Sequence, residues 1–162
     1  MPRGLRTVAI VLTEFLITEH MSVPMKEAAG HRRRVLIVDD VQDITSMLCE
    51  LVMLLGHDAQ VANDGHEALE RTREFHPDLV LLDLGMPDVD GFEIARMLRA
   101  EPDGNAIELI AMSGWGHQSA RARAVQAGFD RHFLKPITVA HLTALLGMPP
   151  KPRASRDSAT LR

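Results

Sequence analysis

Short apolar runs alternate with longer amphipathic segments from about residue 34 onward. The run at residues 35–38 is apolar at every position, as expected of a strand that is buried on both faces of a sheet. The segment behind it places apolar residues, among them Ile44 and Met47, at helical intervals as far as Gly56, a typical helix terminator. This alternation predicts a parallel sheet covered by helices.

Four further units of strand and helix follow the first one. Apolar runs predict strands at residues 59–62, 79–82, 107–112 and 132–134. Helical periodicity returns after each run, and two capping signals mark helix starts: Asp64 stands three residues before Glu67, and Thr138 precedes the last helix. The pattern therefore predicts five strands and five helices.

The alternating pattern also predicts the domain boundaries. A chain of 162 residues with 46% hydrophobic and 25% charged residues has the composition of one globular domain with tails. We expect that domain at residues 33–147, after a partly disordered N-terminal extension (1–32). The basic residues 32–34 should form a solvated lead-in to the first strand. Residues 148–162 should form a disordered basic tail. Since the tail is short, we expect no DNA-binding or catalytic output domain after it.

Charge narrows the choice of partners. The formal net charge of -4 is unevenly distributed, because the central domain is acidic and both tails are basic. An acidic domain repels nucleic-acid phosphates and suits a cation or a basic protein. The single Cys49 excludes an internal disulfide and favours a reducing compartment. The apolar run at residues 8–17 contains Glu14 and is too short to span a membrane. We therefore expect a cytoplasmic protein that binds neither nucleic acid nor membrane.

Polar side chains stand where the predicted strands end. Asp39 and Asp40 follow the first strand, Asp83 the third, Ser113 the fourth and Lys135 the fifth. Binding sites of open parallel sheets form beyond the carboxyl ends of the strands. Each residue alone is as well explained as a turn, cap or surface residue. Together they indicate a site, because three carboxylates at one sheet edge repel each other unless a cation and a lysine neutralise them.

Four sequence blocks resemble the signature blocks of response-regulator receiver domains, in the same order and with similar spacing. They are VLIVDD at residues 35–40, LLDLGMPDVDG at 81–91, MSG at 112–114 and FLKP at 133–136. The resemblance implies an α/β, flavodoxin-like, doubly wound fold, in which helices cover both faces of a five-stranded parallel sheet. It also implies a phosphorylation-activated switch, not an enzyme, in which a sensor histidine kinase or a histidine phosphotransfer protein donates a phosphoryl group to Asp83.

The same resemblance implies a Mg²⁺ site around the acceptor. Asp40 and Asp83 would bind the ion directly, Asp39 would bind it through water, and the main-chain carbonyl of Gly85 would add another oxygen. An all-oxygen shell that retains waters is what Mg²⁺ prefers.

The resemblance also implies roles for Lys135, Ser113 and His132. Lys135, aimed by a cis-prolyl junction at Lys135–Pro136, would pair with a phosphoryl oxygen. Ser113 would turn toward another phosphoryl oxygen, and His132 stands where many receivers carry a rotating Tyr or Phe. Both would act as switch residues. The signal would pass to an unknown downstream protein through the fourth helix (118–127), the fifth strand (132–134) and the last helix, a surface that also suits a homodimer.

Two other functions stay open. A haloacid-dehalogenase-like, Mg²⁺-dependent phosphatase also forms an aspartyl-phosphate, but its nucleophile resembles the first aspartate of a D-x-D pair after the first strand. Here the first strand ends in adjacent Asp39 and Asp40, and the isolated Asp83 follows the third strand. A pseudo-receiver would bind a partner without phosphorylation, although all five expected side-chain positions are filled with competent residues.

Overall fold

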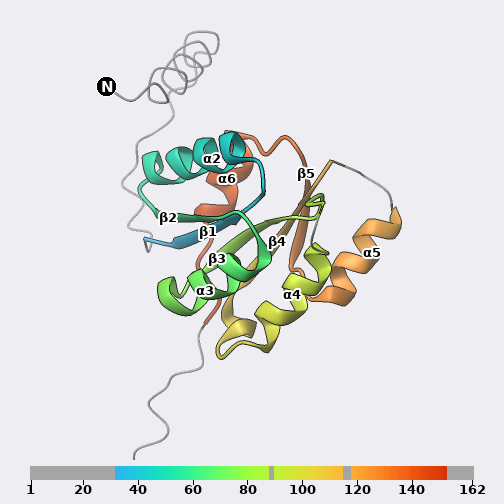
Figure 1. The fold of residues 1–162 in the computed structure, drawn as a ribbon. Helices are drawn as coiled ribbons and strands as arrows, with labels where there is room; N and C mark the ends of the chain where they lie inside the picture. Colours follow the sequence, from blue (N-terminus) through green and yellow to red (C-terminus); the bar gives the residue numbers. More distant parts are fainter. Residues whose placement is uncertain (1–31, 88–89, 115–117, 153–162) are drawn as a thin grey trace, which may run out of the picture. The chain divides into compact units, whose positions relative to one another are not determined.

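The computed structural model describes residues 32–87, 90–114 and 118–152 and, for residues 118–120, the backbone alone. All of these residues belong to one unit of the chain, His31–Arg162. Strands and helices alternate through it (Figure 1). In chain order they are β1 (Arg34–Val38), α2 (Gln42–Leu54), β2 (Asp58–Ala62), α3 (Gly65–Phe75), β3 (Leu79–Asp83), α4 (Gly91–Ala100), the short 3₁₀ helix η1 (Gly104–Ala106), β4 (Glu108–Ser113), α5 (Gln118–Ala127), β5 (Arg131–Leu134) and α6 (Val139–Leu146).

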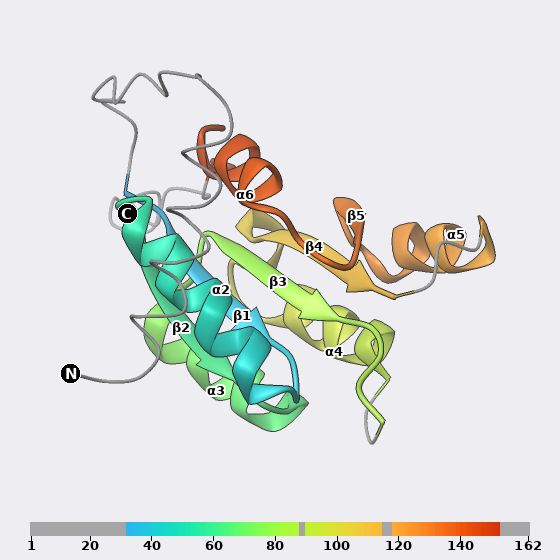
Figure 2. The ribbon, with the colours of Figure 1, turned by 90° about the horizontal axis from the view of Figure 1, so that it is seen from above.

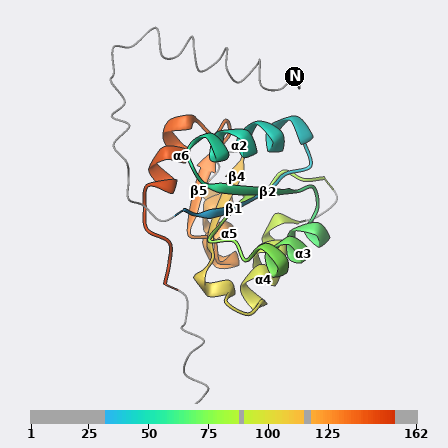
Figure 3. The same ribbon diagram turned by 90° about the vertical axis from the view of Figure 1, so that its left-hand side faces the viewer.

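The five strands form one parallel sheet in the order β2-β1-β3-β4-β5. Helices α2 and α6 cover one face of the sheet, and α3, α4 and α5 cover the other (Figure 3). Seen from above, the arrows of β3 and β4 point to the same edge (Figure 2). The predicted three-layer, doubly wound fold is therefore confirmed, and the carboxyl ends of the strands meet where the sequence predicts a site.

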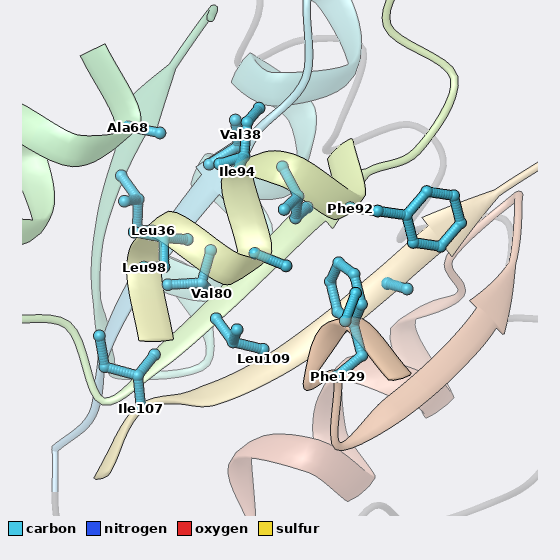
Figure 4. Close-up of a cluster of buried hydrophobic side chains, with 14 of the residues drawn as sticks. Leu36, Val38, Ala68, Val80, Phe92, Ile94, Leu98, Ile107, Leu109 and Phe129 are labelled. Carbon is cyan, nitrogen blue, oxygen red and sulfur yellow. The ribbon is translucent and has the colours of Figure 1, made fainter. Parts of the chain in front are cut away.

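Burial explains why the central strands were the clearest in the sequence. Every residue of β3 is buried, whereas the edge strand β5 is exposed at both of its ends. Between the sheet and the helices on its α3–α4–α5 face lies the main apolar cluster (Figure 4), where the rings of Phe92 and Phe129 meet edge to face at 6.4 Å. Each fully buried large apolar side chain contributes roughly 1.5–3 kcal/mol. This packing holds the strand ends, and hence the site, in place.

Both predicted helix caps are present, with one change of detail. The Asp64 carboxylate accepts a hydrogen bond from the Glu67 N–H at 2.8 Å, but Glu67 accepts in return from Asn63 N–H, one residue before the cap. The Thr138 hydroxyl accepts from the His141 N–H, and the His141 ring accepts from the Thr138 N–H. The start of α6 is thus fixed directly behind the β5 end of the site.

Two side chains lie elsewhere than predicted. Met47 is 43% exposed, because the buried side of α2 is formed by Thr45, Leu48 and Leu51 with Val52, and Met47 projects away from them. Arg33, which we read as part of a solvated lead-in, is only 1% exposed and pairs with the buried Glu108. The 3₁₀ helix η1 is an addition, since it is not among the predicted strands and helices.

The chain ends lie largely outside the described residues. The expected N-terminal extension falls there except for Arg32, and so does most of the expected tail. The described start of that tail contacts the domain, since Lys151 forms an ion pair with Asp130. No helix within the described residues is long and apolar enough to cross a membrane.

Candidate functional site

Three carboxylates gather at the carboxyl ends of β1 and β3. Asp39 and Asp40 directly follow β1, Asp83 ends β3, and one oxygen of each lies within 4.8 Å of the others. Asp39 and Asp83 are buried, whereas Asp40 is exposed. Main-chain amides orient the two buried groups, because Asp39 Oδ1 accepts from the Val41 N–H and Asp83 Oδ1 from the Gly85 N–H, both at 3.0 Å. The predicted acidic cluster is therefore present, and it forms because its residues stand at the ends of the paired strands β1 and β3.

Lys135 reaches this cluster from the end of β5. Its Nζ lies 2.6 Å from Asp39 Oδ2 and 3.1 Å from Asp83 Oδ1. Burial by itself would lower the pKa of this ammonium, but hydrogen bonds to Asp39 and Asp83 raise it, and the net direction is upward. The lysine is therefore charged at neutral pH. Its backbone is held as well, since Lys135 N–H donates to the Ser113 carbonyl and the Lys135–Pro136 peptide bond is cis, as the resemblance predicted.

The donor set fits a hard divalent cation. Three carboxylates face one ammonium, since Lys135 is the only partner that the described residues offer them in an ion pair. This leaves an excess of negative charge and oxygen ligands, which suits Mg²⁺. Gly85 places no side chain beside the acceptor, where a Cβ would be in ordinary van der Waals contact with Asp83 Oδ1 at 3.4 Å. An acidic triad of this kind is typical of the Mg²⁺ site of receiver domains.

Gly91 is needed for the site in a way that the sequence did not reveal. In the sequence it is only the last residue of the LLDLGMPDVDG block. In the structure a Cβ at Gly91 would lie 2.9 Å from the Asp83 carbonyl oxygen and 3.0 Å from Leu84 Cδ2. A side chain there would push the start of α4 away from the acceptor strand, so the glycine permits a close backbone approach. A glycine closing the LLDLGMPDVDG block was the available signal.

Ser113 and His132 form a pair beside the cluster. Ser113 ends β4 and is buried, and β4 pairs with β3 so that Met112 lies opposite Asp83. The Ser113 Oγ lies 2.7 Å from His132 Nε2 on β5. Burial lowers the pKa of the His132 imidazole, and the Arg121 guanidinium lowers it further. The sequence named both residues but not their hydrogen bond. Trp115, two residues after Ser113 in the sequence, lies outside the described residues.

Comparison with protein families finds one family over most of the described chain. The model of the family described as "Response regulator receiver domain" matches residues 35–147. The "Gliding motility regulatory protein" of Myxococcus xanthus is 36% identical over 71% of this chain and 15% of its own length. The "DNA-binding response regulator MtrA" of Mycolicibacterium smegmatis is 33% identical over 70% of this chain and 48% of its own length. The chain thus spans less than half of these curated relatives.

Solved structures show the same fold. The receiver domain (CheY-like) from Methylobacillus flagellatus is 31% identical, with a TM-score of 0.63 over 72% of this chain and 97% of that one. The chemotaxis protein CheY4 of Vibrio cholerae is 23% identical, with a TM-score of 0.68 over 72% of this chain and 97% of its own. At that lower identity the second likeness supports the fold alone.

Proposed function

This chain belongs to the response regulator receiver family, and from that premise we propose that it is a phosphorylation-controlled switch in which Asp83 accepts the phosphoryl group. Receiver domains are phosphoacceptor signalling modules rather than enzymes, so the haloacid-dehalogenase-like alternative is set aside. The observation that carries the proposal is the position of Lys135 Nζ, 3.1 Å from Asp83 Oδ1 inside the acidic cluster. The domain that performs this function is proposed to comprise residues 33–147.

Receiver domains partner with histidine kinases, and the proposed donor is a phosphohistidine of a sensor kinase or of a phosphotransfer protein. A carboxylate oxygen of Asp83 attacks phosphorus while the nitrogen–phosphorus bond of the donor breaks. The departing electron pair stays on the imidazole nitrogen, which takes up a proton from solvent. The negative charge on the phosphoryl oxygens must be neutralised during this step. Lys135 supplies part of the positive charge, because its ammonium is already held beside Asp83.

The acidic residues are proposed to hold Mg²⁺ beside the acceptor. Asp40 and Asp83 would bind it directly, Asp39 would bind it through water, and the Gly85 carbonyl would add an oxygen. The bound ion would supply further positive charge to the phosphoryl oxygens. Asp39 also pairs with Lys135 at 2.6 Å, so this carboxylate positions the lysine as well.

Output is proposed to occur through protein contact. Ser113 would donate its hydroxyl hydrogen to a phosphoryl oxygen, and the resulting change would spread to the surface of α5, β5 and α6. The downstream protein, or a second copy of this chain, would bind there. The acidic charge of the domain argues against nucleic acid as the partner of the domain itself. The relative from Mycolicibacterium smegmatis is named as DNA-binding, but this chain spans only 48% of it.

Phosphorylation by a small donor tests the proposal. Incubation with Mg²⁺ and acetyl phosphate should add one acid-stable, base-labile phosphoryl group, measured by intact mass, and chelation of Mg²⁺ should prevent it. Asp83→Asn should stay folded and unlabelled. Asp43→Asn is the matched control, because Asp43 is an exposed carboxylate in the first turn of the adjacent α2 and should label as the wild type does. Labelling of Asp83→Asn at the wild-type level would refute the assignment, and no labelling of either protein would support the pseudo-receiver alternative.

A further inference from the structure

The contact between Ser113 and His132 links the phosphoryl site to a titratable ring. Ser113 Oγ and His132 Nε2 are 2.7 Å apart, and the serine is buried. A hydroxyl carries one hydrogen, and a neutral imidazole carries its hydrogen on either Nδ1 or Nε2. Two arrangements of this hydrogen bond are therefore chemically distinct. Either the serine donates to Nε2, or Nε2–H donates to the serine oxygen.

Phosphorylation of Asp83 should favour one of these two arrangements of the hydrogen bond. Ser113 ends β4 beside the acceptor strand, since Met112 lies opposite Asp83 and its carbonyl accepts from the Leu84 N–H at 2.8 Å. If Ser113 donates its single hydrogen to a phosphoryl oxygen, it cannot donate the same hydrogen to His132. The contact then survives only if His132 Nε2 carries a hydrogen and becomes the donor. This holds whatever other partners the serine has.

We propose that His132 is a positioning residue for Ser113, and that phosphorylation of Asp83 fixes a hydrogen on His132 Nε2. The inference rests on the proposed function of Asp83. In the phosphorylated protein the imidazole Nε2–H donates to the serine oxygen, and the serine hydroxyl donates to the phosphoryl oxygen. A ring whose hydrogen is on Nδ1 reaches this state by exchanging it for an Nε2 hydrogen through solvent, or by taking up one proton from solvent. No covalent bond other than those to hydrogen changes.

The charges around His132 determine how the protonation of its ring is coupled to phosphorylation. On β4 the group that faces the ring is the Ser113 hydroxyl, and among the described charged side chains Arg121 of α5 is the one that acts on it. Burial and this arginine keep the imidazole neutral at neutral pH in the resting protein. A phosphoryl group adds negative charge on the far side of Ser113 and favours the imidazolium. By reciprocity, protonation of His132 must favour the phosphorylated conformation.

Nitrogen-15 spectra of the imidazole test the proposal directly. The full chain with Mg²⁺ is titrated with acid, with and without beryllofluoride, which mimics the phosphoryl group. We expect Nε2 to bear a hydrogen in the complex, and the titration midpoint of His132 to rise. A rise of about one pH unit corresponds to roughly tenfold tighter binding of beryllofluoride by the protonated form. An Nε2 without a hydrogen in the complex, or an unchanged midpoint, would overturn the proposal.

Three variants separate this mechanism from a purely structural role. His132→Gln keeps a donor and an acceptor but cannot titrate. The increase in beryllofluoride affinity that the wild type shows as the pH is lowered should therefore be lost in this variant. His132→Phe should lose the same increase. Arg121→Gln should raise the resting midpoint of His132 and leave the rise on binding in place. If both His132 variants keep the full pH dependence of the wild type, the proposal is wrong.

The same spectra distinguish failure of this inference from failure of the proposed function. Binding at Asp83 should shift the amide signals of Leu84 and Gly85, and these shifts should be absent in Asp83→Asn. If they are absent in the wild type as well, Asp83 does not accept the mimic, and both the function and the inference fall. If they occur while His132 Nε2 carries no hydrogen or the midpoint of His132 does not rise, the inference alone falls.

Discussion

The two ends of the sheet differ in whether their charged side chains are compensated by partners within the domain. At the amino end, the buried Arg33 guanidinium lies 2.8 Å from the Glu108 carboxylate and donates to the Leu145 carbonyl at 3.0 Å. At the carboxyl end, Asp39 and Asp83 share Lys135, and Asp40 adds a third negative charge. In the first set the carboxylate is compensated by guanidinium groups of the domain, Arg33 and Arg131, and Arg33 ties α6 to the sheet. The second set is not balanced by the described residues.

This difference separates the residues that stabilise the fold from those that act on a ligand. A buried pair that is complete costs a great deal to break, because one charge is then left without compensation. An incomplete set of like charges costs stability in the resting protein and is relieved by a bound cation. Removing a charge should therefore destabilise the amino end and stabilise the carboxyl end.

The largest effect is expected from Arg33→Met. The substitution leaves the buried Glu108 carboxylate with Arg131, whose Nε is 3.4 Å away, as its remaining ion-pair partner among the described residues. We expect a loss of about 3 kcal/mol in the free energy of unfolding, measured with a chemical denaturant.

The neighbouring arginine provides a matched control for that loss. Arg32 also pairs with a carboxylate, that of Asp58 at 2.5 Å, but its side chain is 70% exposed. Arg32→Met should cost less than about 1 kcal/mol. Equal losses from Arg32→Met and Arg33→Met would mean that the amino end is not the charge-balanced region described here.

A smaller effect of opposite sign is expected from Asp40→Asn. The substitution removes one of three like charges, so without divalent cations the free energy of unfolding should rise by up to about 1 kcal/mol. Added Mg²⁺ should stabilise the wild type more than this variant. Asp43→Asn should show neither change, since Asp43 lies outside the cluster and its charge favours the start of α2. Destabilisation by Asp40→Asn in the absence of cations would contradict the comparison.

The smallest effect is expected at Asp130, at the amino end of β5. Burial alone would raise the pKa of this carboxyl, but the Lys151 ammonium, the Leu109 amide and the Arg99 guanidinium lower it, and they prevail. The contribution of Asp130 to stability is thus complete at pH values above the ordinary aspartate pKa of about 3.9. It is lost as the pH falls through the lower pKa of the folded state. Asp130→Asn should be less stable than wild type near neutral pH, with a difference that shrinks in acid.

The Lys151 ammonium offers a check on that cause. In Lys151→Met, as in Asp130→Asn, the free energy of unfolding should change less between neutral and acid pH than it does in the wild type. The reason is that the Lys151 ammonium pairs with the Asp130 carboxylate. A stability difference between wild type and Asp130→Asn that stays constant from neutral to strongly acid pH would show that the carboxylate is not coupled to folding.

The carboxyl end could be predicted from sequence because its residues occupy positions that topology alone defines. Asp39, Asp83 and Lys135 each follow an apolar run, and the ends of parallel strands meet at one edge. Their convergence needed no knowledge of side-chain conformation. The hydrogen bond between Ser113 and His132 did need it, because the register of β4 against β5 places His132 opposite Ala111, and the conformation of its side chain brings the ring to Ser113.

The amino end could not be predicted in the same way. Arg33 stands among three consecutive arginines, which in a sequence are typical of a solvated segment. Its partner Glu108 is 75 residues away and becomes a neighbour only through the pairing of β1 with β3 and of β3 with β4. The available signal was a glutamate at the start of a buried strand, which requires a cation nearby.

Chemical trapping of the acyl phosphate tests the central claim most directly, because it identifies the modified residue itself. Borohydride reduces an aspartyl-phosphate to homoserine, which peptide mass spectrometry detects. After treatment with acetyl phosphate and Mg²⁺, we predict homoserine at position 83 within the tryptic peptide of residues 74–96, with Asp78, Asp88 and Asp90 in the same peptide unchanged. Homoserine at Asp39, at Asp40 or at another aspartate, with Asp83 intact, would contradict the account.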